Sequence, residues 1–583
     1  MMRKRHSTLT LAILCIALLL TACEAVSPKT RKVIPEWSRG LQLGVAAVNQ
    51  PVHIVSSQGK AHVLWVTAGN RSLSYVRLGE SGQVESHAEL AIGGAHPSDT
   101  RLLVYGDGTC AALWTDNPNM PRALFLAQFA SNGALLSGPT RLTPDGARVA
   151  DIAAVSGTDD SYELFWADES PAEGGLHHIH LSGHTPGQDQ LLVAGAMSPV
   201  AQADQNGRIH LTWTVEPSLR ENYVYYALFD PATQSLISPT RVAMYRTATG
   251  LVSYPPRLGL DSTRVYLFWS LEQRGGGNSP GEAHTYYVSF PIDQPQAVEP
   301  VMLDIPDLAR PVYAAATGEL PYNRLASATV GSPTSLLYMP STISGQNTEL
   351  GVFLVAQVST RHRTTREVVW AVFRDGMLQG YQLPSSTGSA MRPEASLDSN
   401  GNVHLVWLST GGFGRYEVYY ASTAPNIRSA LDRITLQDLA ADLLNAMWNL
   451  APAIGFFPPV FLLWTFVSFV WVILYYFVRV EGGMERRGSQ IALGIAILLY
   501  LFSKLFLMPG VLFYAPFINR FPEHLQIVPV LGTPLLTLAA AIAALWLYAR
   551  KREFKSLFAM YMIFVLTDAL LSLIIYVPGW LGG

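Results

Sequence analysis

The sequence predicts an all-β seven-bladed β-propeller followed by an α-helical membrane domain of four transmembrane helices. Three observations carry this prediction. The stretch GRIHLTWTVEPSLRENYVYYAL at 207–228 is closely repeated as GNVHLVWLSTGGFGRYEVYYAS at 401–422. Four long apolar stretches follow the second copy. The chain has 583 residues, which is more than one ordinary domain needs.

The N-terminus has the pattern of an export signal over residues 1–22. Three basic residues at 3–5 precede an apolar run at 9–20 that is too short for a comfortable membrane span. The run ends in Leu-Thr-Ala-Cys, which resembles the lipobox of bacterial lipoprotein signal peptides. The resemblance implies cleavage before Cys23 and a lipid on Cys23, and the alternative is an uncleaved signal anchor. Both interpretations export the rest of the chain.

Cysteine usage leaves no pair for an intramolecular disulfide in the exported region. The sequence has only Cys15 in the signal, Cys23 at the expected lipidation position, and Cys110. The stability of the exported domain must therefore come from packing. We expect a linker over 23–36 and the propeller over 37–425.

The repeated stretch occurs in weaker form at other positions. Six copies end their first apolar run in a tryptophan, and these are Trp65, Trp114, Trp166, Trp213, Trp269 and Trp407. Successive tryptophans from Trp65 to Trp269 are 49, 52, 47 and 56 residues apart. The 138 residues between Trp269 and Trp407 leave room for a degenerate seventh copy and an insertion near 311–347.

Each copy predicts two adjacent antiparallel strands. A Gly, Asp or Asn turn precedes the run that ends in tryptophan, and a polar loop then leads to a second run rich in Tyr, Val and Phe. The period of about 50 residues leaves space for two more strands, which makes a four-stranded blade.

Two copies share the turn pattern Asp-x-x-Gly-x-x-His-Leu-x-Trp, from Asp204 to Trp213 and from Asp398 to Trp407. This pattern resembles the sialidase-like propeller superfamily, and SLDSNGNVHLVW, with Asp398, resembles a loosened Asp-box. One extra residue separates Asp398 from Gly401, so this sequence departs from the family pattern. In that superfamily such turns are structural, so the resemblance implies the fold and says little about activity.

No catalytic residue, metal site or cofactor is predicted. The resemblance would require an arginine cluster, a tyrosine nucleophile and an acidic partner around the axis, and none can be placed from the sequence. The tyrosines recur at one strand position, which favours blade packing for Tyr225, Tyr226, Tyr286, Tyr287, Tyr419 and Tyr420. The same argument makes His62, His210 and His404 part of the repeat.

The run His177-His178-Ile179-His180 suggests a metal site, but nothing near it supplies a third or fourth converging ligand. The loops at 274–284 and 311–347 differ most between copies. They predict either a ligand or partner face, or ordinary tolerance of a surface loop. A formal net charge of −3 gives no basic surface for nucleic acid.

The residues after 425 predict helices. An amphipathic helix is expected over 428–450, with its apolar residues at helical spacing. Four transmembrane helices are expected within 453–577, at about 453–478, 490–514, 526–549 and 556–577. The loops at 479–487 and 550–555 are basic, so the positive-inside rule places both in the cytoplasm. The propeller and the C-terminus would then lie outside the cell membrane.

Two ionisable residues fall within these spans. Lys504 in the second and Asp568 in the fourth are both near mid-depth, so an ion pair between two helices is geometrically feasible. The alternative is that Lys504 extends to the interface and Asp568 finds a hydroxyl or backbone partner.

The sequence therefore predicts a bacterial, membrane-anchored propeller that binds an envelope glycan or a partner protein, with membrane lipid as its other partner. One alternative is a glycoside hydrolase of sialidase-like fold. The other is a non-catalytic subunit of a membrane transport or signalling complex.

Overall fold

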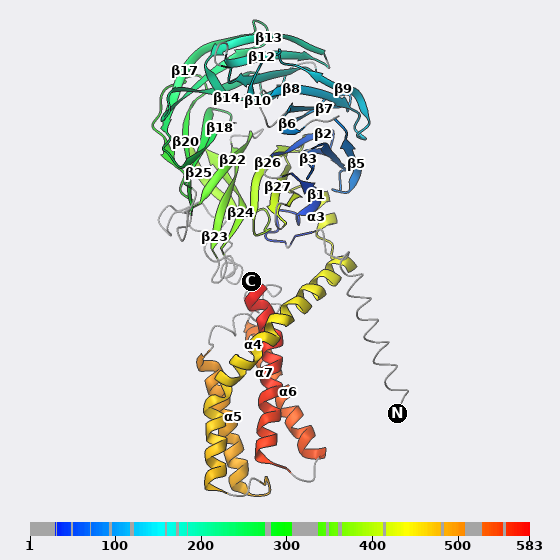
Figure 1. Ribbon diagram of the computed structural model, residues 1–583, viewed down its shortest axis with the longest axis vertical. Coiled ribbons are helices and arrows are strands. Elements are labelled where there is room, and N and C mark those ends of the chain that lie inside the picture. The colour runs from blue at the N-terminus through cyan, green and yellow to red at the C-terminus, as the bar shows by residue number, and fades with distance from the viewer. Residues whose placement is uncertain are drawn as a thin grey trace.

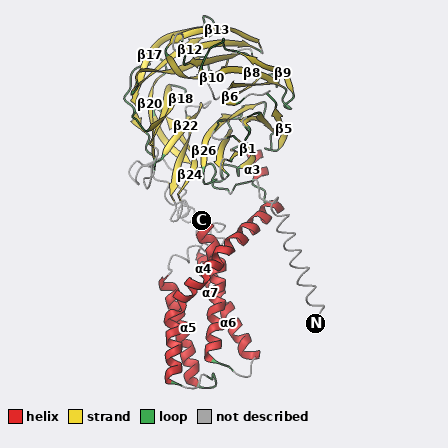
Figure 2. Ribbon diagram, viewed as in Figure 1, coloured by secondary structure: helices red, strands yellow, loops and turns green. Residues whose placement is uncertain are grey.

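The structure is a computed structural model that confirms the predicted architecture, a seven-bladed β-propeller followed by a helical domain (Figures 1 and 2). It describes residues 29–582, with the longest gaps at 306–335 and 508–526. The shorter gaps are at 31, 48–49, 70, 93–95, 117–121, 158–159, 171–173, 184, 274–280, 345–348, 360–363, 412–414, 480–482 and 552–554.

Seven antiparallel four-stranded sheets make the blades. Blade 1 contains β2 (Val52–Ser57), β3 (Lys60–Val66), β4 (Leu73–Leu78) and β5 (Val84–Leu90). Blade 2 contains β6 (Pro97–Val104), β7 (Cys110–Asp116), β8 (Ala123–Phe129) and β9 (Leu135–Arg141). Blade 3 contains β10 (Val149–Ser156), β11 (Tyr162–Asp168), β12 (Gly175–Ser182) and β13 (Thr185–Ala194).

Blade 4 contains β14 (Ala196–Ala203), β15 (Ile209–Ser218), β16 (Glu221–Asp230) and β17 (Ser235–Arg246). Blade 5 contains β18 (Leu251–Leu260), β19 (Arg264–Gln273), β20 (Glu282–Pro291) and β21 (Val301–Met302). Blade 6 contains β22 (Leu337–Ser344), β23 (Leu350–Ser359), β24 (Thr364–Arg374) and β25 (Met377–Gln382). Blade 7 contains β26 (Ala390–Leu397), β27 (Val403–Thr410), β28 (Tyr416–Ser422) and β1 (Leu41–Ala46).

The first strand of each blade lies toward the axis, and successive first strands contact one another around the ring (Figure 1). The ring closes in blade 7, where β1 from the N-terminal side pairs with β28. All first strands run the same way, so we call the end where they begin the mouth face. The opposite end, with the turns from first to second strands, is the turn face.

The predicted repeat tryptophans all lie in second strands, and all six are nearly inaccessible to solvent. Behind them three blades repeat a histidine–tyrosine hydrogen bond between second and third strands. The Nδ1 to hydroxyl distances are 2.7 Å for His62–Tyr75, 2.8 Å for His210–Tyr226 and 2.7 Å for His404–Tyr420. These histidines are therefore core residues, and each has its Nδ1 atom hydrogen-bonded within the blade.

The turns at Asp204 and Asp398, which have similar sequences, also have the same hydrogen-bond pattern. Asp204 Oδ1 accepts hydrogen bonds from the backbone N–H groups of Asn206 and Arg208, at 2.8 and 2.9 Å. Asp398 Oδ1 does the same with Asn400 and Asn402, at 2.9 and 2.8 Å. Both turns lie on the turn face, where the aspartate organises the reversal of the chain.

The helical region differs from the predicted single helix at 428–450. The structure has a short α3 (Pro425–Leu431), a break, and a long α4 (Leu436–Val478) that continues without interruption into the first span. The break is explained by a capping box, because Thr435 and Asp438 exchange hydrogen bonds that start a new helix there. α3 packs on the turn face, where a Cβ on Gly82 would lie 3.0 Å from Ile427 Cγ2.

Three further helices complete the helical domain: α5 (Arg487–Leu507), α6 (Ile527–Lys551) and α7 (Leu557–Gly582). Among the described residues, four segments are long and apolar enough to span a membrane, at 457–478, 487–507, 527–550 and 557–576. α7 contacts each of the other three helices. Large apolar side chains cover the outer surface of the four, as expected where lipid is the solvent.

Candidate ligand site at the mouth of the propeller axis

Six of the seven first strands, all but β2, carry a β-bulge near their start. In blades 2, 4, 5 and 7 the bulge lies opposite the blade tryptophan, for example at Asp99 and Thr100 opposite Trp114. Blades 3 and 6 have a bulge in the corresponding region. Four bulge residues have left-handed backbone although none is glycine, and these are Asp99, Ser198, Met339 and Arg392 with φ of 45°, 51°, 56° and 46°. Such strained positions concentrate at functional sites.

The side chains in and directly after these bulges carry charge toward the axis. Arginines come from blades 2, 5 and 7, and carboxylates come from blades 2, 3 and 7. We call the following set the axial cluster: His53, Asp99, Arg101, Asp151, Arg257, Arg392 and Glu394. Its three arginines balance its three carboxylates in number, so the cluster has no excess of either formal charge.

One half of the axial cluster is joined by hydrogen bonds. Arg101 Nη2 donates to the Ile152 carbonyl oxygen at 2.9 Å, and its Nη1 lies 3.4 Å from His53 Nε2. The other ring nitrogen, His53 Nδ1, is 2.8 Å from Glu394 Oε1. This order suits a neutral imidazole that accepts from Arg101 and donates to Glu394. Burial lowers the pKa of His53, which favours this neutral form.

The second half of the cluster is open. Among the residues that the structure describes, the Arg257 guanidinium forms no hydrogen bond or ion pair. Burial and the neighbouring Arg101 lower the pKa of Arg257, while Glu394 and Asp151 act in the opposite direction. Asp151 is already engaged, because its Oδ2 accepts a hydrogen bond from Ser198 Oγ at 2.9 Å. Arg257 is therefore a cation with donors available at the mouth face.

A tyrosine and a carboxylate lie beside the cluster. Tyr254 precedes the bulge of β18, and its hydroxyl donates to Glu272 Oε2 at 2.6 Å. Burial raises the pKa of Tyr254, and the nearby Arg392 acts to lower it. Burial likewise raises the pKa of Asp99, which forms a 3.5 Å ion pair with Arg122.

The sequence analysis did not find the axial cluster, although one signal was available. In four blades a proline stands thirteen or fourteen residues before the repeat tryptophan, or before Leu354, which takes the place of the tryptophan in blade 6. These prolines are Pro199, Pro256, Pro340 and Pro393. Each lies in the bulge of a first strand, where no ladder hydrogen bond is lost. The recurring proline thus indicates the position of the bulge in the sequence, and the residues beside it are those that lie toward the propeller axis.

The other predicted residues lie away from the axis. The six tyrosines are on third strands, and several stack on blade aromatics, as Tyr225 does on Trp213. His178 and His180 share Glu163 at 2.7 and 2.8 Å, while His177 bonds Asp189 at 3.0 Å on the other face of the strand. Among the described residues no group of three or more His, Cys, Asp or Glu could hold a metal ion.

Lys504 and Asp568 are brought together between α5 and α7. Lys504 Nζ is 2.6 Å from Asp568 Oδ2 and also donates to Ser572 Oγ at 2.6 Å. Tyr500 donates to the same carboxylate oxygen at 2.7 Å. The pair faces the interior of the helical domain. Cys23 and most of the 311–347 insertion lie outside the described residues.

No family model and no curated protein matches the chain. Solved structures with a similar arrangement include a protein of unknown function from Dyadobacter fermentans (9% identity, covering 67% of this chain and 99% of that chain, TM-score 0.37). Others are a polysaccharide lyase PL25 ulvan lyase (11%, 65% and 94%, TM-score 0.42) and a Trypanosoma rangeli sialidase in complex with sialic acid (9%, 69% and 61%, TM-score 0.35). At TM-scores this low, these similarities carry no functional conclusion.

Proposed function

We propose that this protein is a membrane-anchored, extracytoplasmic propeller that binds a carboxylate-bearing glycan at the mouth of its axis. The observation that carries the proposal is that the Arg257 guanidinium has no hydrogen-bond or ion-pair partner among the described residues. A guanidinium presents donors in a planar fork that matches a carboxylate, so Arg257 suits an acidic sugar. Asp99, Asp151 and Glu394 offer acceptors for the hydroxyl groups of the same sugar.

The membrane topology of the proposal follows from the basic loops. The backbone N–H of Met484 donates to the carbonyl of Lys555 at 3.0 Å, so the two loops predicted to be basic and cytoplasmic meet at one end of the helical domain. This neighbourhood supports a common side for both loops. The propeller and the C-terminus then lie on the extracytoplasmic side, and Cys23 carries the lipid.

The test is a titration of the full-length protein in detergent with acidic oligosaccharides, both uronate-containing and sialylated. The matched control for each oligosaccharide is the same molecule with its carboxylates reduced to alcohols. The proposal predicts saturable binding that is lost on carboxyl reduction. Equal binding of acidic and reduced forms would contradict a carboxylate site. No glycan binding, together with a protein that crosslinks to the mouth face, would favour a partner protein instead.

A second candidate function is glycoside hydrolysis, because of the hydrogen bond between Tyr254 and Glu272 beside the arginines. In the resemblance to sialidase-like enzymes, a tyrosine is the nucleophile, and a neighbouring carboxylate would accept its proton. This candidate predicts release of product from an acidic aryl glycoside, lost in Tyr254→Phe and kept in Tyr225→Phe. Binding without turnover by the wild-type protein would leave the binding function alone.

A further inference from the structure

The break between α3 and α4 exposes two large apolar side chains on a rigid support. We call residues 432–438 the corner. Ile434 is 69% exposed and Leu436 is 84% exposed. Among the described large apolar residues outside the four spans, only Leu219 is more exposed than Leu436. Exposed apolar side chains of this size mark a surface that another apolar phase covers.

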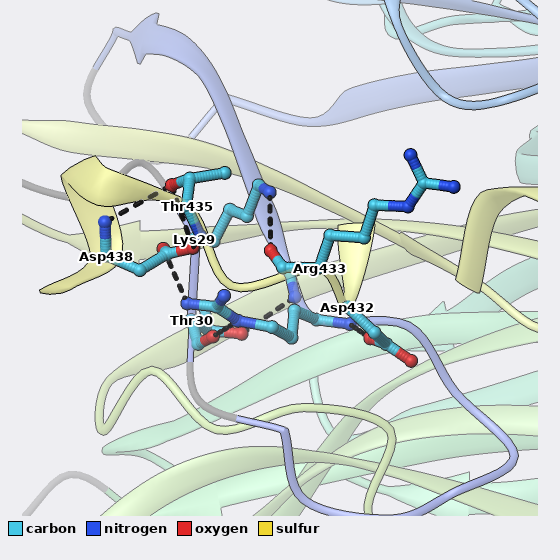
Figure 3. A network of polar contacts seen from close by, with 8 residues as sticks. Lys29, Thr30, Asp432, Arg433, Thr435 and Asp438 are labelled. Carbon is cyan, nitrogen blue, oxygen red and sulfur yellow. Dashed lines mark hydrogen bonds and ion pairs between the residues drawn. The ribbon is translucent and has the colours of Figure 1, made fainter. Parts of the chain in front are cut away.

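The corner is held by the segment before β1, so its exposure is not that of a loose loop (Figure 3). Arg39 Nη2 pairs with Asp438 Oδ1 at 3.0 Å, and the Arg39 backbone N–H donates to Asp432 Oδ1 at 3.1 Å. Lys32 forms an ion pair with Asp432. Asp438 Oδ2 in turn accepts from the Thr435 N–H at 2.8 Å and starts α4. The side chains of Arg39 and Asp438 are mostly buried.

The charge at the corner is positive where it meets solvent. Both corner carboxylates are paired, Asp432 with Lys32 and Asp438 with Arg39. Lys29 donates to the Arg433 carbonyl oxygen at 3.5 Å. Figure 3 shows the Arg433 side chain pointing away from this network. A pair of exposed apolar side chains beside the exposed Arg433 cation is the composition of a surface that binds the headgroup region of a bilayer.

The corner is also close to the membrane along the chain. α4 is continuous from Leu436, and its spanning part begins at Phe457. These 21 residues, which we call the α4 arm, measure about 31 Å at 1.5 Å per residue. The corner therefore reaches the bilayer surface when the α4 arm tilts toward the membrane plane. Ile434 is one of the apolar residues that the sequence places at helical spacing over 428–450.

The N-terminal segment sets a second limit. Lys29 is six residues after Cys23, so the two are at most about 21 Å apart even in a fully extended chain. A lipid on Cys23 therefore keeps the corner within that reach of the bilayer, which an upright α4 arm would not allow. This step, unlike the preceding ones, rests on the proposed acylation.

From these observations we infer that the corner is a membrane-docking surface. Ile434 and Leu436 insert among the headgroups of the outer leaflet, Arg433 lies near lipid phosphates, and the first half of α4 lies along the membrane surface. The bound partner is the lipid bilayer that holds the spans. The mouth face, which is opposite to the turn face that α3 contacts, is then held away from the lipid and open to its ligand.

The test uses nitroxide labels on the full-length protein in vesicles of phosphatidylethanolamine and phosphatidylglycerol. Single cysteines replace Ile434 or Leu436 in a Cys110→Ser background, and the parent without an added cysteine reports any label on Cys23. Leu219→Cys is the matched control, since Leu219 is 97% exposed in the hairpin between β15 and β16 on the mouth face. Phe466→Cys, within the α4 span, is the lipid-facing reference.

The inference predicts that lipid-soluble oxygen relaxes the labels at 434 and 436 several-fold more than a water-soluble nickel chelate does, with the reverse at 219. Labels at the corner as accessible to nickel as the label at 219 would overturn it. Labels shielded from both reagents would overturn it too, because protein would then cover the corner. If the label at 466 also lacked the lipid signature, the membrane topology would fail together with the docking. Loss at the corner alone would remove only the docking.

Discussion

The chain gathers opposite charges at two places, the axial cluster of the propeller and the Lys504–Asp568 pair between α5 and α7. In the helical domain the lysine meets Asp568 at 2.6 Å, with Tyr500 and Ser572 completing the group. At the axis, Arg257 has no such partner within the described residues. The difference separates a charge that is neutralised within the fold from the charge that we propose binds a ligand. It also weakens the view that Lys504 and Asp568 face another chain.

The largest expected effect comes from breaking the closed pair. Lys504→Met leaves Asp568 buried without its cation and should cost about 3–5 kcal/mol of the free energy of unfolding of the helical domain. The measurement is unfolding in mixed detergent micelles. Lys555→Met, at an exposed basic loop, is the control and should change little. Equal stability of the two variants would show that the pair does not hold α5 to α7.

The second effect is a pH dependence of the propeller that arises in its core. Burial lowers the pKa of His62 to about 4, whereas the unfolded chain has the ordinary value near 6.5. The unfolded state therefore binds the proton first, and stability falls as the pH drops from about 6.5 to about 4. The loss assigned to His62 is on the order of 3 kcal/mol.

The measurement for this effect is the free energy of unfolding of wild type and His62→Asn at pH 7 and pH 4. The variant should lose less stability than wild type between the two pH values. A pH dependence identical in both proteins would contradict the assignment to His62, and would direct attention to His53, His210 and His404, whose pKa values burial also lowers.

A smaller effect tests whether repeated blades are energetically alike. Tyr226→Phe and Tyr420→Phe each remove the hydroxyl bonded to a buried histidine, so each should cost about 1–3 kcal/mol. Tyr225→Phe, on the same strand as Tyr226, is the control, because the structure gives its hydroxyl no partner among the described residues. Chemical denaturation of the three variants checks this. If Tyr226→Phe and Tyr420→Phe lowered the free energy of unfolding by very different amounts, the similar sequences of these two blades would not have the same structural role.

The smallest expected change in stability belongs to Arg257→Gln, within about 0.5 kcal/mol of wild type, because no described contact is lost. The thermal unfolding midpoint of the variant should match that of Arg241→Gln, an exposed arginine of the outer strand β17. A strong destabilisation by Arg257→Gln would show that Arg257 stabilises the fold rather than serving a ligand.

Much of the fold could be predicted because the repeated positions bury the same side chains in each blade. The six tryptophans marked second strands, and only the sixth blade, with Leu354 at the equivalent place, departs from the pattern. The closure of blade 7 by β1 could not be read in the same way, since it depends on pairing between Leu41 and Tyr420 across most of the chain. The start of α4 was missed by the prediction of one helix over 428–450, although Thr435 and Asp438 stand at capping-box spacing.

The candidate site was harder to predict for a physical reason. Its residues come from five blades, and the blades contribute side chains of opposite charge at the same structural place, such as Arg101, Arg257 and Glu394. A search for repetition finds what the blades share and passes over what distinguishes them. The bulge register brings these residues together, and that register is fixed only when the first strands pair with their neighbours.

The central claim is that Arg257 serves a ligand rather than the fold, and the most direct test is one titration. Full-length wild type, Arg257→Gln and Arg241→Gln are titrated with an acidic oligosaccharide that the wild type binds. Loss of the charged hydrogen bonds should weaken binding to Arg257→Gln by about 1.5–3 kcal/mol, roughly 10- to 150-fold in Kd, and leave Arg241→Gln unchanged. Wild-type affinity in Arg257→Gln would contradict the account.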